Sequence, residues 1–203
     1  LHLAALIAIP FSYSSPDAYV QTNVTGTLNV LQSARRNSVE HLVCTSTSET
    51  YGTAQFVPIS ESHPLNAQSP YAATKVASDQ MALAFHRSFD TPVSILRPFN
   101  TFGPRQSARA VIPTVIGQIA SGQKEIKLGS LHPTRDFTFV ADTSRGFIQM
   151  MNTDRCFGEV ANIGTGHEIS IGETVELLSD LMGASVTVIQ DNLRERPAAS
   201  EVE

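Results

Sequence analysis

Hydrophobic and polar positions along the chain form blocks that predict strands and helices in alternation. Short apolar runs, which are typical of buried strands, occupy residues 1–7, 41–45, 93–96, 160–163 and 186–189. Stretches with apolar residues three or four positions apart predict helices over residues 16–36, 70–89, 112–121, 142–151 and 170–182. Strands that alternate with helices over long connections predict a mostly parallel sheet that is covered by helices on both faces.

Residues that favour helix starts support these bounds. Ser15 and Asp142 are expected to cap the helices that follow them, and Pro16 occupies a first helical position, where no backbone donor is needed. Ser170 and Glu173 have the spacing of a capping box. The predicted apolar stripe of the 16–36 helix consists of Val20, Val24, Leu28 and Leu31.

Composition narrows the class of protein. At 203 residues and 41% hydrophobic positions, the chain can bury the core of one domain or slightly more. The formal net charge of −5 gives no reason to expect nucleic acid as a partner. Most basic residues are arginines, whose guanidinium groups suit phosphate, although ordinary surface arginines are an equal alternative. The arginines that follow the first polar stretch include Arg97, Arg105, Arg109, Arg135, Arg194 and Arg196.

The cysteines and histidines indicate neither a disulfide nor a metal site. Cys44 and Cys156 lack the Cys-x-x-Cys spacing, and Cys44 lies in a predicted buried strand, where an inert thiol is expected. The six histidines follow no metal-ligand spacing, so core or solvated side chains are expected. The sequence shows neither a signal segment nor a long apolar run, so a cytoplasmic protein without membrane association is expected.

Candidate chemistry lies where the strand at residues 41–45 ends and on the helix that follows. Ser46, Thr47 and Glu49 come after the apolar run, and Tyr71 and Lys75, four residues apart, share one helix face. Ligands of α/β proteins bind beyond the carboxyl ends of strands. A cation beside a tyrosine favours the phenolate, which can take a proton from a sugar or alcohol hydroxyl. A polar turn without chemistry is the alternative, and the Tyr71/Lys75 pair makes it the less favoured one.

Together with further segments, these residues resemble the extended short-chain dehydrogenase/reductase family, specifically its NAD-dependent nucleotide-sugar epimerases and dehydratases. The segments that carry the resemblance are residues 2–5, 22–27, 46–52, 71–75, 97–104 and 135–142. Residues 8–13 and 105–113 are most similar to the 4,6-dehydratases of legionaminic acid synthesis, which act on a nucleotide-linked N-acetylglucosamine. The resemblance implies an enzyme with NAD as cofactor and a nucleotide sugar as substrate.

The fold that the resemblance implies is α/β, a Rossmann-like doubly wound parallel sheet with a small C-terminal α/β substrate-binding region. Residues 1–104 and 142–166 are expected to form the NAD-binding part, and residues 105–141 and 167–203 the substrate-binding part. The family's glycine-rich phosphate loop is not found in this sequence, so the chain looks like a fragment and is expected to bind NAD poorly by itself. A homodimer through the two long helices beside the site is also expected by resemblance.

The resemblance assigns roles to individual residues. NAD is expected to contact Leu3, Ala4, Ala5, Thr45, Ser46, Tyr71, Lys75 and Pro98. The nucleotide sugar is expected to contact Asn100, Arg109, Arg135, Arg196 and Glu201. Catalysis is expected from Tyr71 with Lys75, which act on the C4 hydroxyl of the sugar, and from Thr47, Ser48 and Glu49.

The Thr47-Ser48-Glu49 triplet favours a dehydratase among the family's activities. A 4-epimerase oxidises and reduces one carbon, whereas a 4,6-dehydratase must also remove the C5 proton and expel the C6 hydroxyl, which suits a carboxylate. Serine is too weak an acid for the leaving hydroxyl, so Glu49 is assigned both proton transfers and Ser48 an orienting role. The alternatives are a UDP-glucuronate decarboxylase, a sugar 4-epimerase and, from another class, a non-catalytic fragment that only binds sugar nucleotide.

Overall fold

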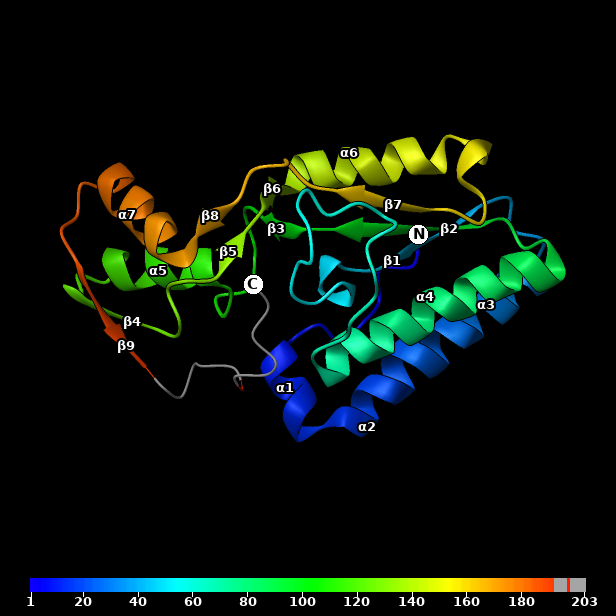
Figure 1. Cartoon of the computed structure of the whole chain (residues 1–203), viewed down its shortest axis with the longest axis horizontal. Helices are drawn as coiled ribbons and strands as arrows, with labels where there is room; N and C mark the ends of the chain where they lie inside the picture. Colours follow the sequence, from blue (N-terminus) through cyan, green and yellow to red (C-terminus); the bar gives the residue numbers. More distant parts are fainter. Residues whose placement is uncertain (192–196, 198–203) are drawn as a thin grey trace.

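The computed structural model describes residues 1–191 and 197. At its centre lies a parallel sheet with the strand order β1 (Leu42–Thr45), β2 (Val93–Pro98) and β7 (Val160–Ile163). The helices α3 (Gly26–Arg36) and α4 (Pro70–Phe89) cover one face, and α6 (Val140–Met151) covers the other (Figure 1). The predicted parallel sheet with helices on both faces is confirmed.

The two faces of β1 bury their side chains in different hydrophobic clusters. The cluster against α3 and α4 includes Leu31, Leu42, Cys44, Ala82 and Ile95. The cluster against α6 includes Val43, Leu96, Phe147 and Met150. Successive residues of a strand point to opposite faces, so a strand that is buried on both sides has a nearly continuous apolar run. This is why the apolar runs located the strands of the sheet.

The C-terminal part of the chain has a hydrophobic cluster of its own. It consists of α5 (Val111–Ala120) and α7 (Ile171–Leu181) with the parallel pair β4 (Glu125–Leu128) and β9 (Thr187–Gln190). Shorter pairs are β3 (Asn100–Phe102) with β6 (Phe137–Phe139), parallel, and β5 (Thr134–Arg135) with β8 (Ile169–Ser170), antiparallel. The boundaries between the NAD-binding and substrate-binding parts stay a prediction, as does the homodimer.

Two helix starts follow directly from the local sequence. The Ser69 hydroxyl accepts the backbone N–H of Ala72 at 3.1 Å and thereby caps α4. The capping box at the start of α7 is confirmed, because the Ser170 hydroxyl accepts the Glu173 amide and the Glu173 carboxylate accepts the Ser170 amide.

Two other predicted caps are wrong. α2 (Pro16–Tyr19) begins after Ser15, but the Ser15 side chain makes no capping hydrogen bond. α6 begins at Val140, so Asp142 lies inside the first turn and pairs there with Arg145 on the exposed face. A carboxylate in the first turn still interacts favourably with the positive end of the helix, which explains why Asp142 marks the start without capping it.

The prediction of a buried strand over residues 1–7 is wrong. Only His2 pairs with β1, as an isolated bridge to Cys44, and Leu3 and Ile7 are 59% and 69% exposed. After His2, the backbone at Leu6 bonds to the Asn23 side chain and not to a strand. The Asn23 amide accepts from the Leu6 N–H at 2.8 Å and donates to the Leu6 carbonyl at 3.0 Å. The next residues form a helix that was not predicted, α1 (Ile9–Ser14).

The helical stretch over residues 16–36 is confirmed, and from its predicted stripe Leu31 is buried in the core and Leu28 packs against it, but the buried face also includes polar positions that were not predicted. α2 continues through a π-helix (Val20–Thr25) into α3, and Val20 is 46% exposed. The buried positions are Tyr19, Asn23, Thr27, Leu31 and Ala34. Asn23 and Thr27 are polar yet have partners, since Asn23 bonds Thr74 and Thr27 bonds the His2 ring, both at 3.0 Å. A stripe drawn through apolar residues alone therefore misses the two polar positions of this face, Asn23 and Thr27.

Two 3₁₀-helices, Ser48–Thr50 and Asp154–Cys156, complete the helical segments of residues 1–191. Within the same described part of the chain, none of the helices combines the length and the apolar character that a membrane crossing requires.

Burial of Cys44 leads to a prediction about thiol chemistry. Burial raises the pKa of the Cys44 thiol to about 12, so its thiolate fraction at neutral pH is on the order of 10³-fold below that of a free cysteine. A Cys156→Ser variant, whose one remaining thiol is Cys44, is expected to react with an aromatic disulfide reagent only after unfolding in urea. Absorbance of the released thiol measures this, and rapid reaction of the folded variant would contradict it.

Candidate active site

The polar residues after β1 form a tight turn. The Ser46 amide bonds the Leu96 carbonyl at 2.7 Å, so the ladder between β1 and β2 extends one residue beyond Thr45. The Thr47 hydroxyl then accepts the Glu49 amide at 3.2 Å and caps the 3₁₀-helix Ser48–Thr50. The backbone thus turns at the carboxyl end of β1, and Ser48 and Glu49 lie beyond the end of this strand.

A cleft of about 600 Å³ lies beyond this turn. Ser48 and Glu49 of the turn line it together with Asn100 of β3 and Arg135 of β5. The remaining lining residues are Gly52, Ala54, Val57, Pro58, Ile59, Phe99, Thr134, Asp136, Asn162, Gly164, Gly166, His167 and Glu168. The cleft therefore lies where the carboxyl ends of the sheet meet the C-terminal part, the place where α/β proteins bind ligands.

Tyr71 is packed beside the catalytic candidates of the turn. It lies in the first turn of α4, is 6% exposed, and meets the ring of Tyr19 edge to face at 6.2 Å. Burial raises the pKa of the Tyr71 phenol, a hydrogen bond with the Thr47 side chain lowers it, and the negative charge of Glu49 raises it further. The phenol is therefore hydrogen-bonded to the Thr47 side chain and lies within the electrostatic range of Glu49, although Tyr71 itself does not line the cleft.

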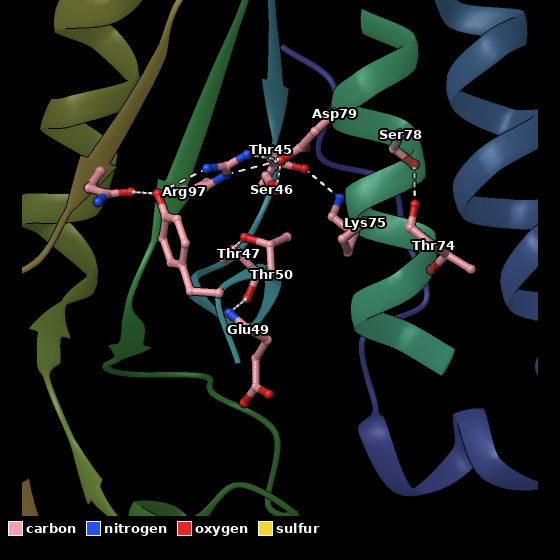
Figure 2. Close-up of polar contacts among 12 residues, drawn as sticks. Thr45, Ser46, Thr47, Glu49, Thr50, Thr74, Lys75, Ser78, Asp79 and Arg97 are labelled. Atoms are coloured by element: carbon pink, nitrogen blue, oxygen red, sulfur yellow. Dashed lines mark hydrogen bonds and ion pairs between the residues drawn. The ribbon is translucent and has the colours of Figure 1, made fainter. Parts of the chain in front are cut away.

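Lys75 lies one turn after Tyr71 and reaches the end of β1 (Figure 2). Its ammonium donates to the Thr45 carbonyl at 2.5 Å, and burial lowers the pKa of Lys75. The sequence predicted that Lys75 shifts the phenol towards its ionised form. Burial of the phenol raises the pKa of Tyr71 in this structure, and the effect of Lys75 on the phenol stays a prediction.

A buried ion pair behind the turn was not predicted. Arg97 of β2 donates from Nε and Nη2 to Asp79 Oδ2 at 3.0 and 2.9 Å, and both side chains are at most 3% exposed (Figure 2). Burial raises the pKa of the Asp79 carboxyl, although Arg97 and the Ser46 hydroxyl act to lower it. Arg97, one of the arginines considered for phosphate, is therefore an interior residue.

The substrate-binding candidates divide into three groups. Asn100 and Arg135 line the same cleft as Glu49, and the neighbouring Asp136 accepts backbone N–H groups of Thr165 and Gly166 at 2.8 to 2.9 Å. Arg109 lies apart from them, along a separate open hollow with Pro113 and Gln118. Arg196 and Glu201 lie outside the described residues.

The cofactor candidates surround the carboxyl end of β1. Thr45 N–H bonds the His2 carbonyl at 3.1 Å, so residues 3–5 leave the sheet beside Thr45, and Pro98 is the last residue of the neighbouring β2. The Thr45 hydroxyl is buried and has no hydrogen-bond partner among the described residues. An unpaired buried hydroxyl is costly, so a polar ligand at this strand end fits the position predicted for the cofactor.

Sequence reasoning missed part of the cleft. His167 and Glu168 line it, and Glu168 accepts the Thr134 hydroxyl at 2.8 Å. The sequence feature that could have indicated them is the pair Gly164 and Gly166, which marks a loop directly after β7, at the carboxyl end of a strand. Asp79 had a signal too, because it continues the four-residue spacing of Tyr71 and Lys75 along α4.

Known proteins with similar sequences and structures include dehydratases and epimerases. The chain is 36% identical to the dTDP-glucose 4,6-dehydratase of Streptomyces griseus, over 94% of the chain and 59% of the relative. It is 31% identical to a putative UDP-glucose 4-epimerase of Methanocaldococcus jannaschii, over 96% of the chain and 64% of the relative. The chain thus spans less than two thirds of these relatives.

A solved structure shows the same fold. The dTDP-glucose 4,6-dehydratase of Streptomyces venezuelae, crystallised with NAD bound, matches 96% of the chain and 61% of its own length, with 33% identity and a TM-score of 0.87. The predicted Rossmann-like α/β fold is confirmed by this match. Residues 1–202 match the family model of GDP-mannose 4,6-dehydratase, and the chain belongs to that family.

Proposed function

We propose that the protein is an NAD-dependent nucleotide-sugar 4,6-dehydratase that converts UDP- or GDP-linked N-acetylglucosamine to a 4-keto-6-deoxy sugar with retention at C5. One observation carries the proposal: Glu49 lines the cleft, and its charge acts on the phenol that is hydrogen-bonded to Thr47. A carboxylate beside a Tyr/Thr pair supplies the additional proton transfers that elimination of water requires. The legionaminic acid pathway is the context that residues 8–13 and 105–113 suggest.

The residues at the end of β1 fit the cofactor. Thr45, Ser46 and Lys75 with the segment 3–5 would hold NAD, and the unpaired Thr45 hydroxyl supports this position. Bound NAD would supply the hydride acceptor for C4 of the sugar and the hydride donor for C6, which would make the overall reaction redox-neutral. The positive nicotinamide ring is also the kind of charge that favours the Tyr71 phenolate against the effect of burial.

The protein's own residues move the protons. Tyr71 takes the proton of the C4 hydroxyl, and Thr47 donates a hydrogen bond to the C4 oxygen. Glu49 removes the C5 proton and then, as a carboxylic acid, protonates the C6 hydroxyl that leaves as water. A proton finally returns to C5. Glu49 has by then given its first proton to the leaving water, so it takes up a second one from solvent, which balances the C4-hydroxyl proton that Tyr71 releases at the end of the cycle. Because Glu49 delivers this second proton to the face from which it took the first, one glutamate implies retention of configuration at C5.

Charges of the cleft bear on the two alternatives. Among the described lining residues, Glu49, Asp136 and Glu168 are carboxylates and Arg135 is the only arginine. This balance disfavours a second anionic group on the sugar and hence a glucuronate substrate. A 4-epimerase is the second candidate, because the Methanocaldococcus jannaschii relative is a putative UDP-glucose 4-epimerase and epimerisation needs only Tyr71 and Thr47.

The full-length protein, supplied with NAD, is expected to convert UDP- or GDP-N-acetylglucosamine to a product that has lost one water and absorbs in alkali as a 4-keto-6-deoxy sugar. Mass spectrometry and absorbance measure this. UDP-glucuronate serves as the parallel substrate, and release of carbon dioxide from it would support the decarboxylase. Inversion at C4 without a change of mass would support the epimerase, and either result would contradict the dehydratase.

A further inference from the structure

Residues 46–51, here named the catalytic turn, are held at both ends by one buried ion pair. At the start of the turn, the Ser46 hydroxyl donates to Asp79 Oδ2 at 2.8 Å. At its end, Arg97 Nη1 donates to the Tyr51 hydroxyl at 2.9 Å. Asp79 and Arg97 bond each other directly, so the pair bridges the two ends of the turn (Figure 2).

Tyr51 connects this pair to the wall of the cleft. Its side chain is fully buried, and the Arg97 guanidinium lies 4.9 Å from the centre of its ring. The Tyr51 hydroxyl donates to Asn162 Oδ1 at 2.8 Å, and Asn162 Nδ2 donates to the Ile59 carbonyl at 3.2 Å. Asn162 and Ile59 both line the cleft. One phenolic hydroxyl therefore joins the catalytic turn, the ion pair and the cleft wall.

The catalytic turn is a single short helical turn, in which the Thr47 hydroxyl accepts the Glu49 N–H at 3.2 Å and the Thr50 hydroxyl donates to the Thr47 carbonyl at 2.8 Å. Its internal backbone bonds are those of a 3₁₀-helix: Tyr51 N–H to the Ser48 carbonyl at 3.0 Å, and Thr50 N–H to the Thr47 carbonyl at 3.4 Å. Such short helices have poorer hydrogen-bond geometry than α-helices. From outside, the Asn66 N–H donates to the Thr50 carbonyl at 3.0 Å, and the contacts of Ser46 and Tyr51 with the ion pair hold the two ends of the turn.

We propose that Tyr51 is a positioning residue, whose hydroxyl fixes the catalytic turn so that the Glu49 carboxylate stays within reach of the sugar. The proposal rests on the proposed function. Asp79 and Tyr71 both belong to α4, two turns apart, so the same helix fixes the phenol and, through Asp79, the turn. Figure 2 shows the Glu49 carboxylate pointing away from the Asp79–Arg97 pair, which suits a support that does not contact the substrate.

The test is Tyr51→Phe, which keeps the ring and removes only the hydroxyl. Because small displacements of a catalytic group reduce rates strongly, kcat for dehydration is expected to fall ~10–100-fold, with KM within about twofold of the unmodified protein. Amide hydrogen exchange at Tyr51 and Gly52 is expected to accelerate roughly fivefold, the factor that corresponds to one net hydrogen bond. Steady-state kinetics and exchange measured by mass spectrometry give the two readouts.

Ser78→Ala is the matched control, because it removes another buried hydroxyl of α4, bonded to the Asn23 and Thr74 carbonyls and outside this network. It is expected to lower the melting temperature while kcat and the exchange of the turn stay unchanged. An unchanged kcat or unchanged exchange in Tyr51→Phe, or an equal loss of kcat in Ser78→Ala, would overturn the proposal. Amide exchange can be measured without substrate turnover. If the unmodified protein were inactive, that result would contradict the proposed function, while the exchange measurement would still test the role of Tyr51.

Discussion

Replacing Glu49 by glutamine is expected to lower kcat for loss of water by about 10²–10⁴-fold, the range that positioned acid/base groups contribute. Glutamine keeps the shape of the side chain but can neither take the C5 proton nor protonate the leaving hydroxyl. Tyr71 and Thr47 remain, so oxidation at C4 is expected to continue. Product formation measures the first effect, and deuterium incorporation at C5 in heavy water, detected by mass spectrometry, measures the proton transfer directly.

Glu176→Gln is the control for this substitution, because Glu176 is an exposed carboxylate of α7 outside the cleft. It is expected to leave kcat and C5 labelling unchanged. If Glu49→Gln retained C5 labelling at the original rate, another group would have to be the base, and the assignment of Glu49 would be wrong. If C4 oxidation also stopped, Glu49 would instead be needed for the geometry around Tyr71.

Features with a local cause could be predicted from the sequence. The helix face shared by Tyr71 and Lys75 follows from their spacing, and the start of α4 follows from the Ser69 cap. Position also carried information, because a polar stretch after a buried strand lies beyond the sheet edge in any α/β fold. Ser48 and Glu49 therefore lie in the cleft as expected.

Features that depend on distant partners could not be predicted in this way. Asn23 and Thr27 are buried because residues far along the chain, Thr74 and His2, satisfy their polar groups. Residues 1–7 are apolar like a strand, yet a single bridge at His2 joins them to β1. The hydrophobic pattern of a sequence indicates which residues tend to be buried, but not which residues they contact. For this reason it predicted neither the buried polar residues nor the single bridge at His2.

Replacing Arg97 by methionine is expected to destabilise the protein by about 3–5 kcal/mol, because it leaves the Asp79 carboxylate buried and unpaired. Asp79 accepts its Arg97 bonds at 2.9 and 3.0 Å in a site where both side chains are at most 3% exposed, so water cannot replace the lost partner. Urea unfolding followed by circular dichroism measures the change in the free energy of unfolding. The double variant Asp79→Leu/Arg97→Met is expected to recover part of the loss, since no charge then remains buried.

Asp142→Asn is the matched control, because it breaks the exposed ion pair with Arg145 on α6, whose side chains are 50% and 67% exposed. An exposed pair of this kind contributes about 0–1 kcal/mol, so a small change is expected. An equally small change for Arg97→Met would show that water or a rearranged side chain reaches Asp79. In that case the ion pair could not hold the catalytic turn in place, and the support of Glu49 would have to come from the turn's own backbone.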